Sequence, residues 1–196
     1  MKFSEVRRTV SHRLAGPPAR LLARTSISPD LLTWIGLGIG LGTAAALAKG
    51  LFPLGGGLLL LAGMFDMLDG ALARARDQSS RMGALLDSTL DRLSESVVFF
   101  GLLLFYTGQG SARGVLLVNA ALVASVMVSY IKARGEGLGL ECKVGFLTRE
   151  LRVLVLALGL FLNQVLIALA VIAVFGLATA AQRFLHLRQI DRKQRD

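Results

Sequence analysis

Long runs without a single charged residue constrain this chain more than any other feature. They cover residues 31–48, 51–65, 96–112, 114–131 and 153–182. A helix that crosses a bilayer needs about 20 mostly apolar residues, and lipid offers no partner to unpaired backbone groups. The runs also lack the strict alternation of apolar and polar residues that is typical of barrel strands. They therefore predict an all-α integral membrane protein.

The lengths of the runs indicate six transmembrane helices. The run 153–182 is too long for one span and short for two. Asn163-Gln164 supplies a polar turn in its middle, and two helices fit if the first begins near Val144 and carries two arginines in its first turns. The other four spans are expected at about 31–48, 53–75, 82–106 and 112–134.

The basic residues gather on one side of this six-span arrangement. Of the 22 Lys and Arg residues, only Lys49 and Arg113 are left for the opposite face. By the positive-inside rule, the crowded face is cytoplasmic. We therefore expect a multi-pass protein of the cell (plasma) membrane whose termini and polar site face the cytoplasm. The net charge of +9 favours anionic lipids or anionic substrates, whereas nucleic acid is not an expected partner because the basic residues form no single stripe.

The two ends of the chain differ from its membrane domain. Residues 1–27 place apolar residues at helical spacing among basic ones, which predicts an interfacial amphipathic helix on the cytoplasmic side. Ser28 or Asp30 can cap the first span. Residues 28–190 are expected to form one six-helix membrane domain, and residues 191–196 a basic C-terminal tail.

Four aspartates lie between two of the apolar runs, namely Asp66, Asp69, Asp87 and Asp91. A carboxylate at the membrane centre costs roughly 2.5–3.5 kcal/mol, so such a set needs compensation. The spacings of three and four residues place each pair on one face of its helix. Two facing pairs form a carboxylate cage, and oxygen ligands of this charge favour Mg²⁺ or Mn²⁺.

The four aspartates allow two other interpretations. They can be ordinary surface charges that pair with nearby arginines, but surface charges need neither the helical spacing nor the small residues Gly70 and Gly83 beside the carboxylates. They can also serve a divalent-cation transporter. A transporter predicts acidic residues that continue across the membrane, and the outer halves of the expected spans contain none.

The full pattern Asp66-x2-Asp69-Gly70-x2-Ala73-Arg74-x8-Gly83-x3-Asp87-x3-Asp91 resembles the signature of the CDP-alcohol phosphotransferases. The resemblance implies that CDP-diacylglycerol binds with its pyrophosphate on two metal ions, and that CMP leaves as a second alcohol attacks. It implies that Asp66, Asp69 and Asp87 are metal ligands, and that Asp91 is the general base and can also contact a metal. Two metals suit a displacement at phosphorus, which depends mainly on charge neutralisation and positioning.

The resemblance also implies which residues contact the nucleotide or the CDP-lipid. The segment SPDLLT is similar to the family's Pro-Asn-x2-Thr segment, with Asp30 where asparagine is usual. The candidates are Asp30, Thr33, Asp69, Gly70, Ala73, Arg74, Gly83 and Ser88.

A second group of cations, Lys132, Arg149, Arg152 and Arg183, bears on the acceptor alcohol. Each residue alone is explained by the positive-inside rule, but several cations in one cavity favour an acceptor that carries phosphate. The segments SYIKARGEGLG and TRELR resemble those of phosphatidylinositol phosphate synthases, which use inositol phosphate. This implies that Lys132, Arg152 and Arg183 hold the acceptor phosphate, with Arg149 next in line. Glycerol phosphate, the acceptor of phosphatidylglycerophosphate synthases, remains the alternative, and the family implies a homodimer.

Overall fold

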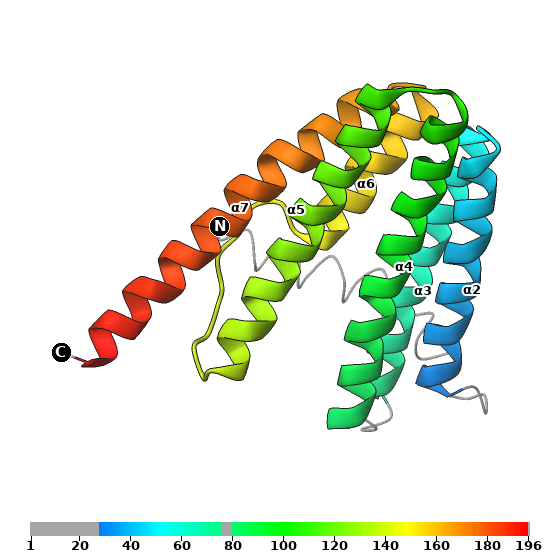
Figure 1. Ribbon diagram of the computed structural model, residues 1–196. Coiled ribbons are helices and arrows are strands. Elements are labelled where there is room, and N and C mark those ends of the chain that lie inside the picture. Colours follow the sequence, from blue (N-terminus) through cyan, green and yellow to red (C-terminus); the bar gives the residue numbers. More distant parts are fainter. Residues whose placement is uncertain (1–27, 76–79, 196) are drawn as a thin grey trace.

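The computed structural model describes residues 28–75 and 80–195, and these residues form helices joined by short turns and one longer loop, without a β-strand. Figure 1 shows the six helices of this part of the chain. They are α2 (Pro29–Ala48), α3 (Phe52–Ala75), α4 (Arg81–Gly108), α5 (Ala112–Gly137), α6 (Arg149–Phe161) and α7 (Val165–Arg195). The all-α prediction is confirmed for the described residues. The predicted interfacial helix within residues 1–27 lies outside them.

Four of the six helices are long and apolar enough to cross a membrane, as expected of an integral membrane protein. They are Asp30–Ala48, Phe52–Asp69, Ala112–Gly137 and Val165–Lys193, found by searching the described residues. The helix α4 carries Asp87, Asp91, Arg92 and Glu95, and these charges keep it out of this group. The other helix outside the group, α6, has 13 residues and rises about 20 Å, which is less than the hydrocarbon thickness of about 30 Å.

The expected start of the fifth helix near Val144 is wrong, because α6 begins at Arg149. The preceding loop is held by other contacts. Gly145 has a φ of 124°, the Leu147 N–H donates to Thr179 Oγ1 at 3.3 Å, and Arg183 Nε donates to the Val144 carbonyl at 3.0 Å. The loop therefore packs on α7 instead of extending α6, and Arg149 becomes the first residue of its helix.

Several local predictions agree with the structure. Ser28 caps α2, and its Oγ accepts a hydrogen bond from the Leu31 N–H at 3.2 Å. The polar turn at Asn163-Gln164 separates α6 from α7, and Asn163 has a φ of 55°, a left-handed conformation that asparagine tolerates. At the other end α7 continues to Arg195, so residues 191–195 of the predicted tail are helical.

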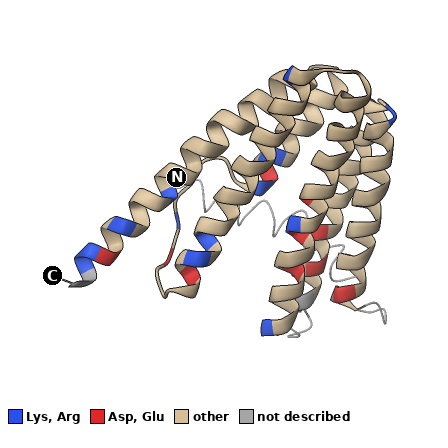
Figure 2. Ribbon diagram, viewed as in Figure 1, with Lys and Arg blue, Asp and Glu red and all other residues tan. Residues whose placement is uncertain are grey.

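The helices pack in two groups, which are connected by α6 and by contacts between α4 and α5. In the first group α2 contacts α3 and α4, and in the second α5 runs along α7, while α6 touches both α3 and α7. Figure 1 shows the two groups meeting at the end where α6 turns into α7 and separating toward the other end. Few charged residues lie at the meeting end in Figure 2, and the acidic residues of α3 and α4 lie in the halves away from it. This arrangement places the aspartates near one end of the molecule.

Gly101 allows α2 and α4 to approach closely, because a Cβ at this position would overlap the backbone of Ala44. We expect Gly101→Ala to lower the free energy of unfolding by about 1–3 kcal/mol, the usual cost of overpacking. Gly38→Ala is a matched control, because no atom lies within 4 Å of a Cβ built there. Thermal unfolding of the detergent-solubilised protein, followed by circular dichroism, should show a lower midpoint for the Gly101 variant alone. Equal midpoints would mean that the two helices do not need this close contact.

Candidate metal and substrate site

Three of the four aspartates meet where the end of α3 faces the beginning of α4. Asp66, Asp87 and Asp91 each offer a carboxylate oxygen, and these oxygens lie within 4.8 Å of one another. The chain reverses direction between α3 and α4, so the two helices bring their polar turns to the same end. The i,i+4 spacing of Asp87 and Asp91 then directs both carboxylates toward Asp66.

Asp69 does not belong to this group of three. It is buried, with 4% of its surface exposed, and Thr33 Oγ1 on α2 donates to its Oδ2 at 2.9 Å. The expected cage of four carboxylates is thus a cluster of three with Asp69 beside it. The Thr33 contact connects the start of α2 to the end of α3.

The cluster fits a divalent metal ion. Its donor atoms are all carboxylate oxygens, the ligands preferred by Mg²⁺ and Mn²⁺. Asp87 Oδ1 is buried and has no hydrogen-bond partner among the described residues. A buried carboxylate oxygen without a partner is costly, and a cation bound by the three aspartates would satisfy it.

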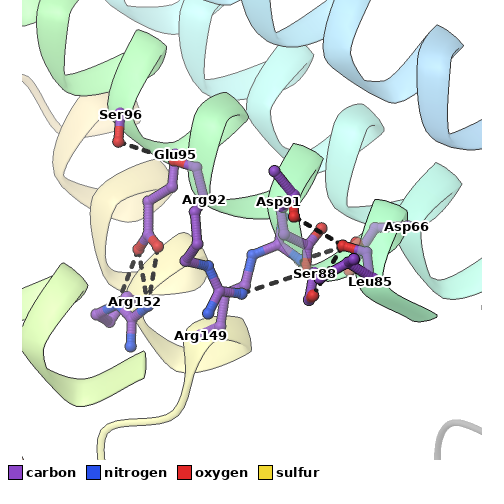
Figure 3. Close-up of polar contacts among 10 residues, drawn as sticks. Asp66, Leu85, Ser88, Asp91, Arg92, Glu95, Ser96, Arg149 and Arg152 are labelled. Atoms are coloured by element: carbon purple, nitrogen blue, oxygen red, sulfur yellow. Dashed lines mark hydrogen bonds and ion pairs between the residues drawn. The ribbon is translucent and has the colours of Figure 1, made fainter. Parts of the chain in front are cut away.

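Arg149, predicted as an acceptor-binding residue, instead contacts two of the aspartates. Its Nη1 lies 2.7 Å from Asp66 Oδ1 and 2.7 Å from Asp91 Oδ2. Figure 3 shows the guanidinium reaching from the start of α6 toward these carboxylates. Arg92 Nη2 makes a longer contact of 3.3 Å with the same oxygen of Asp91. Two cations therefore compensate the negative charge that Asp66 and Asp91 carry near the membrane.

Glu95 was missed by the sequence analysis, although it lies one turn beyond Asp91 on α4. It pairs with Arg152 through two hydrogen bonds, from Nε to Oε1 at 2.9 Å and from Nη2 to Oε2 at 3.0 Å (Figure 3). Arg152 has only 2% of its surface exposed. A glutamate inside the expected span 82–106 was itself a signal, because a carboxylate at that depth requires a partner.

The remaining predicted acceptor residues lie apart from the aspartates. Arg183 is buried and donates to two backbone carbonyls, from Nε to Val144 at 3.0 Å and from Nη1 to Val128 at 2.6 Å. The Lys132 ammonium is half-exposed, 3.7 Å from Glu136 on the next turn of α5. The four predicted cations are therefore not brought into one cluster in this structure.

A cavity of about 400 Å³ connects the polar groups with an apolar interior. Its polar lining comprises Thr33, Asp66, Asp69, Asp91, Glu95, Arg149 and Arg152, among others. Most of the rest is apolar and includes Leu37, Leu59, Met64, Phe99 and Val153. A ligand with a charged head and an apolar body matches this distribution.

The predicted nucleotide-contacting residues belong to three helices, α2, α3 and α4, and Thr33 and Asp69 among them line the cavity. Asp30 is exposed in the first turn of α2. The Gly83 N–H donates to the capping Ser80 Oγ at 2.9 Å, and the exposed Ser88 donates to the Leu85 carbonyl at 3.0 Å. Gly70, Ala73 and Arg74 belong to the last turns of α3, and their side chains lie outside the described part of the chain.

Comparisons with known proteins agree in the family they indicate. The profile of the CDP-alcohol phosphatidyltransferase family matches residues 26–182. The archaetidylinositol phosphate synthase of Methanothermobacter thermautotrophicus is 34% identical over 172 residues, covering 85% of this chain and 86% of that protein. The phosphatidylinositol phosphate synthase of Mycobacteroides abscessus is 37% identical over 186 residues, covering 87% and 82%.

Solved structures of a further relative resemble the fold. The crystal structure of Mycobacterium tuberculosis phosphatidylinositol phosphate synthase with CDP-DAG bound has a TM-score of 0.80 and 33% identity, covering 89% of this chain and 94% of that one. The same enzyme in complex with manganese and citrate has a TM-score of 0.80 and 34% identity, covering 89% and 88%. The arrangement of helices is thus shared with a structure that binds a cytidine-activated lipid and a divalent metal.

Proposed function

The chain belongs to the CDP-alcohol phosphatidyltransferase family, and we propose that it transfers the phosphatidyl group of CDP-diacylglycerol to inositol phosphate, releasing CMP. The observation that carries this proposal is the cluster of Asp66, Asp87 and Asp91, of which Asp66 and Asp91 line the polar end of a largely apolar cavity. The relatives described above support the choice of acceptor, because their names are those of synthases of archaetidylinositol phosphate and phosphatidylinositol phosphate. Membership of this family identifies the chain as an enzyme and argues against the interpretation as a cation transporter.

The aspartates would hold the metal that the reaction needs. Asp66, Asp87 and Asp91 offer the clustered oxygens, and Asp69, oriented by Thr33, lies next to them. Mg²⁺ or Mn²⁺, with two ions expected, neutralises charge on the pyrophosphate when bound. The diphosphate would lie at the polar end of the cavity, with the acyl chains along its apolar walls. Nucleotide contacts are assigned to Asp30, Thr33, Asp69, Gly70, Ala73, Arg74, Gly83 and Ser88.

Asp91 is the proposed general base. The acceptor hydroxyl gives its proton to the Asp91 carboxylate, its oxygen bonds to the phosphatidyl phosphorus, and the bond from that phosphorus to the CMP oxygen breaks. Asp91 Oδ2 accepts a hydrogen bond from Arg92 Nη2 and forms an ion pair with Arg149. The Arg92 contact orients the carboxylate that must receive the proton.

The cations around the cavity support a phosphorylated acceptor. Arg149 and Arg152 both line it, and Arg152 lies one turn further along α6. Lys132 and Arg183 complete the proposed acceptor set. Glycerol phosphate has the same phosphate chemistry and is the second candidate acceptor.

The proposed orientation of the enzyme in the membrane follows from its charge distribution. Among the described basic residues, only Lys49 and Arg113 lie at the end where α2 finishes and α5 begins. We propose that the opposite end, with the aspartates and both termini, faces the cytoplasm at the plasma membrane. We also propose that the enzyme is a homodimer. Each chain would have a membrane domain of residues 28–190 between an interfacial arm and a short tail.

The acceptor is tested by CMP release from CDP-diacylglycerol. We expect purified enzyme with Mg²⁺ or Mn²⁺ to release CMP when inositol phosphate is added, and not when free inositol or serine is added. The physical reason is that the cations near the cavity can form charge-assisted hydrogen bonds to a phosphate group, which free inositol and serine lack. Release with glycerol phosphate alone would replace the proposed acceptor, and the absence of release with every acceptor would contradict the assigned reaction.

A further inference from the structure

Arg149 pairs with two of the three aspartates that could hold a metal ion. Its Nη1 is 2.7 Å from one oxygen of Asp66 and equally close to one oxygen of Asp91. Both residues belong to the group of three whose oxygens are close enough to ligate a single ion. The side chain of Arg149 is 21% exposed and that of Asp91 is 14% exposed, so solvent screens these charges only in part.

The arginine satisfies this cluster incompletely. It contacts Asp66 and Asp91, while Asp87 Oδ1 stays buried without a partner among the described residues. The Arg149 Nε is likewise buried without an acceptor. A divalent cation would engage all three carboxylates, and a free guanidinium would gain an acceptor by meeting an anion. The carboxylates would therefore be better satisfied by a cation, and the Arg149 guanidinium by an anion, than they are by one another.

We propose that Arg149 and the divalent cation exclude one another from Asp66 and Asp91, so that cation binding releases the Arg149 guanidinium to bind substrate phosphate in the cavity. This inference rests on the proposed metal site and adds an order of events to it. A cation and a guanidinium at the same two oxygens repel one another. Arg149 is the first residue of α6 and already lines the cavity, so a change of side-chain rotamer is enough to redirect it.

The exchange makes phosphate binding depend on the metal. A phosphate group that holds Arg149 in the cavity leaves the aspartate oxygens open to the cation, and the cation in turn leaves Arg149 open to the phosphate. The two affinities must change by the same factor, because coupling between two binding sites is reciprocal. Arg149 thereby pairs with the two carboxylates before the metal binds, and it binds the substrate phosphate afterwards.

The first test measures Mn²⁺ binding to purified enzyme by electron paramagnetic resonance of the free ion, without substrate. We expect Arg149→Gln to bind Mn²⁺ about tenfold or more tightly than the wild type, a typical coupling between sites. Arg92→Gln is the matched control. It also removes one positive charge near Asp91, but its contact is longer, at 3.3 Å, and does not reach Asp66. If the affinity for Mn²⁺ rose equally in both variants, the loss of a positive charge alone would explain the rise, and the proposed exchange would be overturned.

The second test follows the guanidinium itself. Phenylglyoxal modifies accessible arginines, and mass spectrometry can quantify the product at each position. We expect Mn²⁺ to increase modification of Arg149 severalfold, while Arg152, buried against Glu95, stays protected and acts as an internal reference. Unchanged or reduced modification of Arg149 on addition of Mn²⁺ would overturn the proposal.

Failure of the exchange and failure of the proposed function are distinguishable. Mn²⁺ binding that is equal in wild type and Arg149→Gln, together with CMP release, would overturn the exchange alone. No Mn²⁺ binding to either protein would remove the metal site and the proposed function with it. Tighter binding in Arg149→Gln would support the exchange even if inositol phosphate proved not to be the acceptor.

Discussion

Replacing Asp91 with asparagine is expected to reduce CMP release by about 100-fold or more, the usual contribution of a general base. The amide has the same shape as the carboxylate but cannot take the proton of the acceptor hydroxyl. Asp91 also lies within 4.8 Å of Asp66 and Asp87 in the metal-fitting cluster and contacts Arg149, so few changes in the molecule touch more of the site. The measurement is initial-rate CMP release at saturating CDP-diacylglycerol and acceptor.

The matched control for this variant is Glu141→Gln. It makes the same chemical change on a carboxylate that is 71% exposed, pairs with Lys143 and lies far from the aspartates in sequence. We expect its rate and its thermal midpoint to equal those of the wild type. An Asp91→Asn enzyme that folds, binds CDP-diacylglycerol and still turns over at the wild-type rate would remove Asp91 from the role of base.

The metal-fitting cluster was accessible from the sequence because helix periodicity acts over short distances. The i,i+4 spacing of Asp87 and Asp91 determines that both face one way once α4 forms, and the antiparallel arrangement of α3 and α4 brings Asp66 opposite them. Spacing alone could not separate Asp69 from the cluster. Its partner Thr33 lies 36 residues away on α2, and that contact depends on how α2 packs against α3.

The surroundings of the cations were harder to predict, because a long flexible side chain can reach many partners. Arg149 contacts aspartates, Arg152 contacts Glu95, and Arg183 donates to one backbone carbonyl in a loop and one in α5. The late start of α6 could not be anticipated either. It depends on the contact of Leu147 with Thr179 on α7, a tertiary interaction that overrides local helix preference.

Glu95→Gln is expected to lower the free energy of unfolding by about 3–5 kcal/mol, the typical cost of breaking a buried ion pair on one side. Arg152 is 2% exposed, and both its Nε and its Nη2 donate to Glu95. Without the carboxylate, the guanidinium remains buried as an uncompensated charge. Thermal unfolding in detergent should show a large fall in the midpoint, in contrast to the unchanged Glu141→Gln control.

A double variant separates this structural effect from the proposed role of Arg152 toward the acceptor. Glu95→Leu combined with Arg152→Met replaces the buried pair with apolar side chains of similar volume, an exchange that is often neutral for stability. We expect the thermal unfolding midpoint of the double variant to return most of the way from that of Glu95→Gln to that of the wild type. If Arg152 also holds the acceptor phosphate, the acceptor KM should rise about tenfold, the loss of one charge-assisted hydrogen bond, while the KM for CDP-diacylglycerol changes little. A recovered midpoint with both KM values unchanged would leave Arg152 as a partner of Glu95 alone, and would move the acceptor site toward Arg149.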